Sequence, residues 1–320
     1  MYFSVIIPVY NRPDELKELL NSLVSQSFQS FEVIVMDDGS SIKSEETIKE
    51  FQGQIHINYQ DQVNQGQGFA RNDGMKLAQG EFFVILDSDV ILPKNYLEAL
   101  KITIEERGLD AFGGPDAAKE DFSPLQKAMD FAMTSFWTTG GIRGKLKNPA
   151  KYQARGFNMG VSRKVFETIG GFIDPNQGED IEYSIRIRKA GFRLELVEEA
   201  YVYHKRKNTL ISFVKQGFSF GRNRINVSRF HPEAIKTVHL LPSLFLVFCI
   251  SIIISGLFSF QIFLLQISIL AIWFLAIFIQ SSYRYKSILV GFYSLITSFA
   301  QLCAYGLGLI FEMIRKIFKG

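Results

Sequence analysis

Short apolar runs alternate with helical patterns over the first 115 residues of the chain. Strand-like runs cover residues 3–9, 31–36, 55–59 and 82–86, and helical patterns cover residues 13–27, 45–51, 66–78 and 93–107. In the first helical pattern, Leu16, Leu19, Leu20 and Leu23 share one predicted face. Strands that alternate with helices predict an α/β fold with a mostly parallel sheet and right-handed crossovers.

The last third of the chain has a different pattern, because charged residues are almost absent from it. No Asp, Glu, Lys or Arg occurs in residues 237–283 or in residues 287–311. A bilayer span needs about 20 apolar residues. The first stretch is therefore long enough for two spans, joined near residues 256–259, and the second for one. Buried core helices are the alternative, but uncharged runs of this length exceed the usual soluble helix.

Charge divides the chain into three zones, which we take as its domains. Residues 1–204 carry a net charge of −8, residues 205–236 carry +7 and residues 237–320 carry +4. The first zone divides further into halves at 1–115 and 116–204. The middle zone is typical of a segment on an anionic membrane surface, where each Lys or Arg adds about 1 kcal/mol. It lacks stacking aromatic residues interleaved on a recognisable nucleic-acid-binding module, so we expect no nucleic-acid partner.

The distribution of basic residues predicts the orientation in the membrane, with one conflict. The positive-inside rule places residues 1–236 in the cytoplasm, which indicates a multi-pass protein of the inner membrane. A strand pattern directly after Met1 predicts no signal peptide. Three spans would leave Arg315, Lys316 and Lys319 outside, against the rule. Either the last apolar segment is re-entrant or interfacial, or this tail is an exception.

Two strand ends carry paired carboxylates. Asp87-Ser88-Asp89 follows the run at residues 82–86, and Asp37-Asp38-Gly39-Ser40 follows the run at residues 31–36. Open α/β sheets bind ligands at the carboxyl ends of their strands. Two carboxylates one residue apart can hold a divalent cation, which can grip a diphosphate. A helix-capping turn is the alternative for either motif, but two such strand ends in one sheet favour a ligand site.

These motifs, with several others in the same order, resemble the family-2 inverting glycosyltransferases of GT-A fold. The residues that carry the resemblance are Ser4-Val5-Ile6-Ile7-Pro8-Val9-Tyr10-Asn11-Arg12, Asp37-Asp38-Gly39-Ser40, Gly68-Phe69-Ala70-Arg71-Asn72, Asp87-Ser88-Asp89, Gly156-Phe157-Asn158-Met159-Gly160, Gly170-Gly171-Phe172 and Gly178-Glu179-Asp180. The resemblance covers about residues 1–230. It implies a Rossmann-like sheet with helices on both faces, followed by the transmembrane helices.

The resemblance also implies which residues hold the donor nucleotide sugar. Pro8 and Tyr10 would lie under the base, and Asp38 would accept a hydrogen bond from a pyrimidine N–H, which favours UDP, although guanine also offers an N–H. The remaining expected contacts are Arg71 on the sugar or a phosphate, Asp87 and Ser88 on the ribose or donor sugar, and Asp89 on Mn²⁺ or Mg²⁺. A surface ion pair is the alternative role for Arg71.

The second half of the first zone carries the expected base. Asp180 opens a helical pattern, and the resemblance implies that it removes the proton of the attacking hydroxyl, with inversion at the sugar carbon. Glu179 is an alternative base or an acceptor contact. Acidic residues at this place can also cap the helix and complement its dipole. An acceptor that is already an ionised phosphate would need no base.

Three further residues are expected near the site. His204, which ends a strand-like run, is a metal ligand in some GT-A enzymes, although a lone histidine is often a surface group. Gln216 and Arg222 lie in an amphipathic pattern at residues 213–224, where relatives contact the donor diphosphate or the acceptor; an anionic-lipid contact is equally compatible. The chain lacks the Gln-x-x-Arg-Trp motif of processive polysaccharide synthases.

The sequence therefore predicts a membrane-bound enzyme that moves a sugar from a nucleotide sugar to a lipid-linked or nascent glycan acceptor, as in bacterial exopolysaccharide synthesis. A polyprenyl-phosphate sugar synthase, with a UDP- or GDP-sugar donor, is one alternative. A non-catalytic membrane scaffold that keeps the fold is another.

Overall fold

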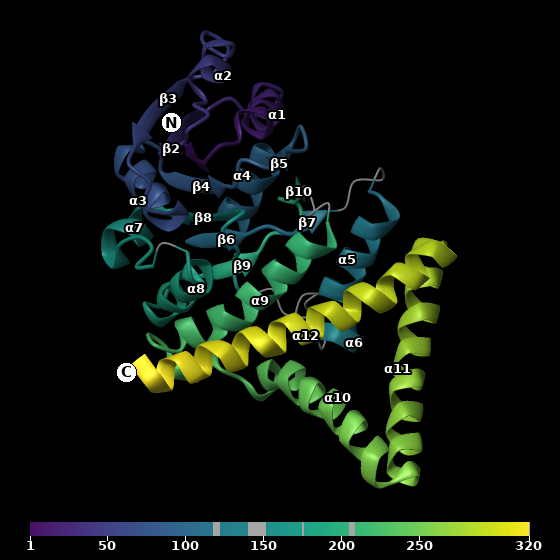
Figure 1. Cartoon of the computed structure of the whole chain (residues 1–320). Coiled ribbons are helices and arrows are strands. Elements are labelled where there is room, and N and C mark those ends of the chain that lie inside the picture. The colour runs from purple at the N-terminus through teal and green to yellow at the C-terminus, as the bar shows by residue number, and fades with distance from the viewer. Residues whose placement is uncertain (118–121, 140–151, 175, 205–208, 320) are drawn as a thin grey trace. The chain divides into compact units, whose positions relative to one another are not determined.

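The computed structural model describes residues 1–117, 122–139, 152–174, 176–204 and 209–319. The chain forms two compact units (Figure 1). The N-terminal unit comprises Met1–Ala117 and Lys147–Lys205, and the C-terminal unit comprises Ala118–Leu146 and Arg206–Gly320. Residues 118–146 thus group with the apolar helices, whereas our charge-based boundaries place them in the preceding zone.

The N-terminal unit contains ten strands and most of the shorter helices among its described residues. Its strands are β1 (Phe3–Val9), β2 (Phe31–Asp38), β3 (Ile57–Gln62), β4 (Phe82–Leu86), β5 (Val90–Ile91), β6 (Ala111–Gly113), β7 (Asp116–Ala117), β8 (Asn158–Ser162), β9 (Leu194–Leu196) and β10 (Val202–His204). Its helices are α1 (Pro13–Val24), α2 (Glu45–Lys49), α3 (Gln67–Leu77), α4 (Tyr96–Arg107), α7 (Arg163–Ile169) and α8 (Glu179–Lys189).

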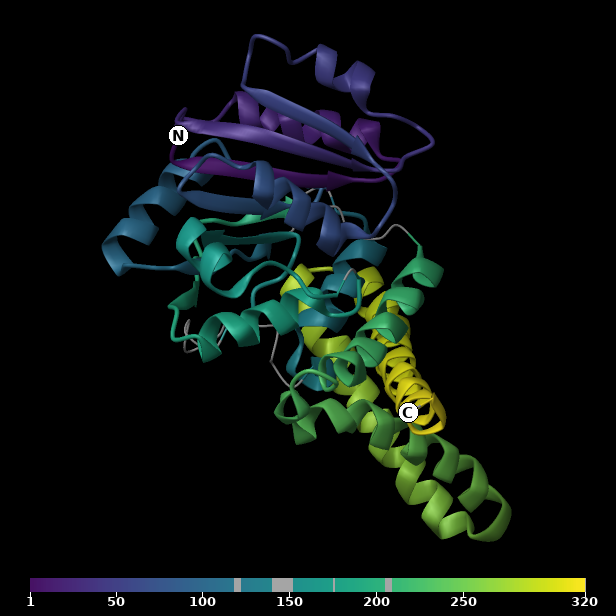
Figure 2. The ribbon, with the colours of Figure 1, turned by 90° about the vertical axis from the view of Figure 1, so that its left-hand side faces the viewer.

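The main sheet has the strand order β3-β2-β1-β4-β8-β6-β9, and β5, β10 and β7 form a second, small sheet (Figure 2). The first four strands are parallel to one another, whereas β8 runs antiparallel to both β4 and β6. The mostly parallel α/β sheet predicted from the sequence is confirmed. Its strands β1, β2 and β4 are buried along their whole length, which explains their unbroken apolar runs.

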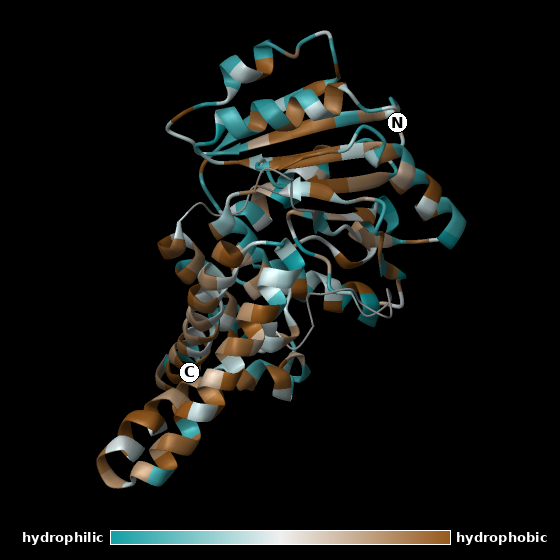
Figure 3. Ribbon diagram, turned by 90° about the vertical axis from the view of Figure 1, so that its right-hand side faces the viewer, coloured by the Kyte–Doolittle hydropathy of each residue, from teal (hydrophilic) through white to brown (hydrophobic). Residues whose placement is uncertain are grey.

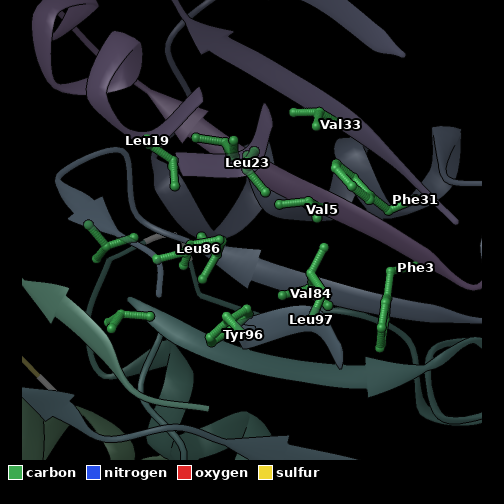
Figure 4. Packing of buried hydrophobic residues seen from close by; sticks show 14 of the residues in the cluster. Phe3, Val5, Leu19, Leu23, Phe31, Val33, Val84, Leu86, Tyr96 and Leu97 are labelled. Carbon is green, nitrogen blue, oxygen red and sulfur yellow. The ribbon is translucent and has the colours of Figure 1, made fainter. Parts of the chain in front are cut away.

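Side chains from both elements of each βα unit fill the core of this sheet. Leu19 and Leu23 of α1 pack over Val5 of β1, and Tyr96 and Leu97 of α4 belong to the same cluster (Figure 4). The predicted leucine face of α1 is confirmed, because Leu16, Leu19, Leu20 and Leu23 are all fully buried. Packing of this amphipathic face, more than helix propensity, holds α1 on the sheet.

Some predicted boundaries were wrong. β3 begins at Ile57 and continues to Gln62, because its polar residues pair with β2 through the backbone and need no burial. α4 begins at Tyr96 and not at Pro93, whose carbonyl oxygen accepts the Tyr96 N–H instead. Thr138 and Thr139 end the short helix α6.

The C-terminal unit is helical throughout its described residues. Its elements are α5 (Pro124–Thr134), α6 (Phe136–Thr139), α9 (Leu210–Val227), the 3-10 turns η2 (Pro232–Ala234) and η3 (Thr237–Leu240), α10 (Leu241–Phe258), α11 (Phe260–Tyr285) and α12 (Ile288–Lys319). Segments Thr237–Phe258, Phe260–Tyr285 and Ile288–Phe318 are long and apolar enough to cross a membrane. The predicted break between the first two segments occurs at Ser259, and the apolar colouring of both helices is visible in Figure 3.

Candidate active site

The carboxyl ends of β1, β2 and β4 meet at one edge of the main sheet. β1 pairs in parallel with β2 and with β4, and Val9 lies opposite Asp37. Asp37 and Asp38 close β2, and Asp87 follows directly after β4. Both acidic strand ends therefore lie at the edge where open α/β sheets bind their ligands.

Asp37 builds the turn that follows β2. Its Oδ1 accepts a hydrogen bond from the Ser40 N–H at 3.0 Å, and its Oδ2 accepts bonds from the Tyr59 hydroxyl at 2.8 Å and the Ser44 N–H at 3.2 Å. Burial tends to raise its pKa, but the hydrogen bonds outweigh burial and hold the pKa of Asp37 below its usual value. This carboxylate is therefore kept ionised in a structural role.

Asp38 orders the segment that leads into α3. Its Oδ1 accepts the Gln65 N–H and the Gln62 side-chain amide, each at 3.0 Å, and its Oδ2 accepts the Gly66 N–H at 2.9 Å. Gly66 precedes α3 with a φ of 93°, a conformation that favours glycine. Because both oxygens of Asp38 are engaged by the protein, its hydrogen bond to a pyrimidine stays a prediction.

The turn after β1 is joined to the turn after β2. The Asn11 side-chain oxygen accepts the N–H groups of Ser41 at 2.8 Å and Ile42 at 2.9 Å. Pro8 is buried within β1, whereas Tyr10 is 52% exposed at its end. The exposed ring can act as a stacking surface for a nucleobase.

The carboxylates of Asp87 and Asp89 are each paired with an arginine. Asp87 Oδ1 lies 2.7 Å from Arg71 Nη2, and Asp89 Oδ2 lies 2.7 Å from Arg12 Nη1. Ser88, between them, is buried. The two arginines differ in their freedom, because the Arg12 side chain is 41% exposed and the Arg71 side chain is fully buried.

Arg71 connects the turn after β4 with the start of α8. Its Nη1 lies 3.0 Å from Glu179 Oε1, opposite the pair with Asp87, and its guanidinium lies over the Phe172 ring. A Cβ at position 156 would approach Arg71 Nη2 to 2.6 Å, which explains the glycine there. We infer that Arg71 acts on carboxylates of the site, since a fully buried side chain has no surface for the donor.

Glu179 and Asp180 form the first turn of α8, after Gly178 with a φ of 85°. Asp180 Oδ2 accepts the Gly156 N–H at 3.2 Å, and Glu179 Oε1 accepts the Gln67 side-chain amide at 2.8 Å. Burial, and then the charge of Asp180, raise the pKa of Glu179 to about 7 in spite of Arg71. A buried carboxyl group with a raised pKa suits acid–base chemistry.

A helix-capping role for Asp180 is also compatible with the geometry. Its Oδ1 accepts the Ile181 N–H at 2.7 Å, and the residue before the helix, Gly178, offers no side-chain cap. Asp180 is half-buried, so part of it is reachable from solvent. The roles of Asp180 and Glu179 therefore stay predictions.

The Asp87 and Asp89 pair fits a divalent cation. Carboxylate oxygens are the hard donors that Mg²⁺ and Mn²⁺ prefer, and the exposed Arg12 can move away from Asp89. Among the described residues, no group of three His, Cys, Asp or Glu side chains could hold a metal, so diphosphate or water oxygens would complete its coordination. The backbone of His204 pairs with Val90, beside Asp89; its side chain lies outside the described residues.

Gln216 and Arg222 both lie on α9 of the C-terminal unit, in the helix predicted at residues 213–224. Arg222 is paired with Glu312 at 2.8 Å. Their contact with the diphosphate or acceptor stays a prediction.

Sequence reasoning missed the roles of Arg12, Asn11 and Gln67. Each one contacts a site residue or turn that is distant in the sequence. A signal was available for Arg12 and Asn11, because they follow β1 directly and β1 lies between β2 and β4. None was available for Gln67, whose partner Glu179 is 112 residues away.

The chain is similar in sequence to known glycosyltransferases. Glycosyltransferase AglE of Haloferax volcanii is 26% identical over 248 residues, which cover 75% of this chain and 78% of AglE. The dolichyl N-acetyl-alpha-D-glucosaminyl phosphate 3-beta-D-2,3-diacetamido-2,3-dideoxy-beta-D-glucuronosyltransferase of Methanococcus voltae is 26% identical over 281 residues, covering 81% and 83% of the two chains.

A solved structure shares the fold. Mannosyltransferase PcManGT from Pyrobaculum calidifontis, in complex with GDP-Man and Mn²⁺, superposes with a TM-score of 0.67 at 16% identity and covers 92% of this chain and 86% of its own. This likeness supports a GT-A fold.

The family model for glycosyl transferase family 2 matches residues 4–170, more than half of the chain. The chain therefore belongs to glycosyl transferase family 2. It is a glycosyltransferase that acts on nucleotide sugars, and the alternative of a non-catalytic scaffold is not supported.

Proposed function

We propose that this glycosyltransferase is membrane-bound and moves a sugar, with inversion, from a UDP-sugar to a lipid-linked or nascent glycan acceptor. The observation that carries the proposal is the ion-pair series Asp87–Arg71–Glu179, in which Arg71 is fully buried. It links the turn expected to hold the donor diphosphate to the turn that carries Asp180. The two halves of the reaction are thereby held at a fixed separation, which displacement in a single step requires.

The donor half works through the strand ends. Tyr10 stacks on the base, Asp38 with its ordered segment borders it, and Asp87 with Ser88 meets the ribose or donor sugar. A divalent cation, when bound at Asp87 and Asp89, neutralises the charge that develops on the leaving nucleoside diphosphate. Arg12, once released from Asp89, is a cation of sufficient reach for the same diphosphate.

The acceptor half works through α8. Asp180 takes the proton of the attacking hydroxyl as the new glycosidic bond forms and the sugar–phosphate bond breaks. Because burial raises the pKa of Glu179 to about 7, Glu179 is largely protonated below neutral pH and then places little negative charge beside Asp180.

The proposed membrane attachment is based on the C-terminal helices, and the proposed lipid-linked acceptor is based on one relative. The three long apolar helices are suited to bring the active site to a membrane surface. The name of the Methanococcus voltae relative describes a dolichyl-linked sugar phosphate as its substrate. An acceptor sugar on a lipid carrier, presented at the inner membrane, fits both observations.

The experiment is a donor and acceptor screen with the full chain in detergent. Release of nucleoside diphosphate is followed for UDP- and GDP-sugars, with Mn²⁺, Mg²⁺ or chelator, and with polyprenyl phosphate or a polyprenyl-linked sugar as acceptor. We expect release from a UDP-sugar that needs the lipid-linked sugar. The matched control is Asp61→Asn, which should keep activity. Asp61 lies on β3 and forms an exposed ion pair with Lys43. Transfer to bare polyprenyl phosphate would instead establish the polyprenyl-phosphate sugar synthase, and preference for a GDP-sugar would overturn the uridine choice.

A further inference from the structure

The helix α12 has its polar side inward and its apolar side outward. Its buried face carries mostly small and polar residues, which are Gly291, Ser294, Thr297, Ser298, Gln301, Gly308 and Glu312, together with the apolar Val290, Leu302 and Leu309. Its exposed face carries large apolar residues, which are Ile288, Leu289, Phe292, Ile296, Phe299, Leu307, Phe311 and Ile314. A helix on the surface of a soluble protein has the opposite arrangement, so the outer face of α12 is built to meet lipid.

The helix α9 lies along the second half of α12 and runs in the same direction (Figures 1 and 2). Gly217 lies beside Ala304, and Lys316 Nζ lies 3.4 Å from the Ser228 hydroxyl. Between these points a Cβ at Gly221 would collide with the Tyr305 carbonyl oxygen. The two backbones therefore touch over several turns, and both helices must lie at the same depth in a membrane.

The helix α9 is too polar to cross the hydrocarbon core. It carries Lys215, Arg222 and Arg224 within 18 residues, and it is not among the helices with the composition of a span. Charged side chains at the bilayer centre are strongly unfavourable. Since α9 stays at the surface, the half of α12 that packs on it stays there too.

The charges at the far end of α12 fit the same position. The Glu312 carboxylate is fully buried and lies 2.8 Å from Arg222, 2.9 Å from Arg229 and 3.5 Å from Arg315. The three arginines outnumber the carboxylate and are partly exposed. This excess of positive charge complements the phosphates of an anionic membrane surface.

The near end of α12 packs on α5, a short amphipathic helix. The Thr297 hydroxyl donates to the Ala128 carbonyl of α5 at 3.0 Å, and just before α12 the Tyr285 hydroxyl lies 2.6 Å from Asp130 of the same helix. Both α5 and α9 follow the N-terminal unit within a few residues of chain. Along its length, α12 is thus packed on segments that lie on the side of the catalytic unit.

The helices α10 and α11 have different surroundings. Both are largely exposed in the described structure. They pack on α12 near the ends that lie away from their connection at Ser259, and there the Ser243 hydroxyl donates to the Gly306 carbonyl oxygen. With 18 and 26 residues, they are about 27 and 39 Å long. These lengths match the hydrocarbon thickness of about 30 Å.

We propose that α10 and α11 are the two membrane spans and that α12 lies in the membrane interface on the catalytic side. Its apolar face dips into the acyl chains, and Arg222, Arg229 and Arg315 meet anionic lipid phosphates. All basic residues of the region after α11 then lie on one side, which removes the conflict with the positive-inside rule. This inference rests on the membrane attachment proposed above, and not on the reaction.

The test is cysteine labelling of the full chain in intact bacterial cells. Cys249→Ser and Cys303→Ser first remove the two native cysteines. Three variants then each carry one cysteine: at Ser259 in the α10–α11 connection, at Ile288, which is 68% exposed at the start of α12, or directly after Gly320. An impermeant maleimide is added before or after the cells are opened. We expect the Ser259→Cys site to react in intact cells, and the other two sites to react only after opening.

Each of three other outcomes would contradict one part of the proposed topology. Reaction of the cysteine after Gly320 in intact cells would show that α12 crosses the membrane. Lack of reaction at the Ser259→Cys site in intact cells, with reaction after opening, would show that α10 and α11 do not cross. Release of the protein from membranes by alkaline carbonate would show that the protein has no membrane-spanning helices. The same labelling on the Asp180→Asn variant gives the same pattern, so failure of the proposed reaction is separable from failure of this topology.

Discussion

Each unit of the molecule has a cluster in which a buried charged side chain lies among two or more charges of the opposite sign, and the sign of the buried charge differs between the two clusters. The N-terminal unit buries the cation Arg71 between the carboxylates of Asp87 and Glu179. The C-terminal unit buries the anion Glu312 among three arginines. The partners also differ, since Arg71 has one buried partner, Glu179, beside the 30% exposed Asp87, whereas all three arginine side chains around Glu312 are 31 to 43% exposed.

The difference teaches what each cluster can do. A buried ion with a buried partner has no replacement for that partner, so removal of one charge is severely unfavourable and the geometry is rigid. Exposed arginines can turn to water or to lipid phosphate when their carboxylate is lost. We therefore expect the Arg71 cluster to fix the active site and the Glu312 cluster to act as an adjustable attachment of α12.

The largest expected effect tests whether the Arg71 cluster holds a catalytic group. Asp180→Asn should lower kcat by a factor on the order of 10²–10⁴, because the general base is lost in the transition state. The donor Kd should barely change. Asn is also a good helix-capping residue, so a merely structural Asp180 would leave kcat nearly intact. Single-turnover transfer at saturating donor, with a nucleotide binding isotherm, separates these outcomes; a wild-type rate would also fit an acceptor that arrives ionised.

The next effect tests the expected cation site at Asp89, which follows the Asp87 end of the Arg71 cluster. Asp89→Asn removes a ligand charge from the cation site, and we expect kcat to fall by a factor on the order of 10²–10³. Nucleotide affinity should lose its dependence on Mn²⁺, measured by calorimetry with and without chelator. Asp61→Asn serves as the exposed control. Unchanged, Mn²⁺-dependent binding in the Asp89→Asn variant would remove this residue from the metal site.

The third prediction addresses the bridge itself. Arg71→Lys keeps the charge, but one ammonium cannot reproduce the planar bridge to two carboxylates. We expect kcat to fall by up to about 10², since a misplacement of about 1 Å has that effect, with little change in donor KM. Arg71→Met leaves both carboxylates without a cation and should lower stability by about 3–5 kcal/mol. A Lys variant with wild-type kcat would mean that the bridge has no positioning role.

The sequence allowed the strands and the acidic strand ends to be predicted, because both depend on local patterns. The runs of β1, β2 and β4 and the leucine face of α1 are of this kind. The pair Arg71–Glu179 could not be predicted, since it joins the helices α3 and α8, which are 108 residues apart and are brought together only by the fold. The same holds for Glu312, whose partners Arg222 on α9 and Arg229 just after α9 are 90 and 83 residues away.

A smaller effect depends on pH. The pKa of Glu179 is raised from 4.5 to about 7, mainly by burial. Between these values the folded state binds more protons than the unfolded state, so stability falls as the pH rises from 4.5 to 7, by up to about 3 kcal/mol. Glu179→Gln mimics the protonated form at every pH. We expect the melting temperature of the variant in detergent to fall less than that of the wild type between pH 5 and 8, and equal falls would contradict the raised pKa.

The smallest effect concerns the buried anion of the C-terminal unit. Glu312→Gln keeps the shape of the side chain and one acceptor oxygen, but it removes the charge that faces Arg222, Arg229 and Arg315. Because these arginines are partly exposed, they can turn to other anions, and we expect a loss of about 1 kcal/mol or less in a neutral detergent. Anionic lipid added to the micelles should restore the wild-type melting temperature, since its phosphates replace the carboxylate. Glu182→Gln, a buried carboxylate paired with Arg186 in the N-terminal unit, is the matched control and should gain nothing from lipid. A large loss in Glu312→Gln that lipid does not restore would show that both buried charges are rigid, and the contrast between the two units would be wrong.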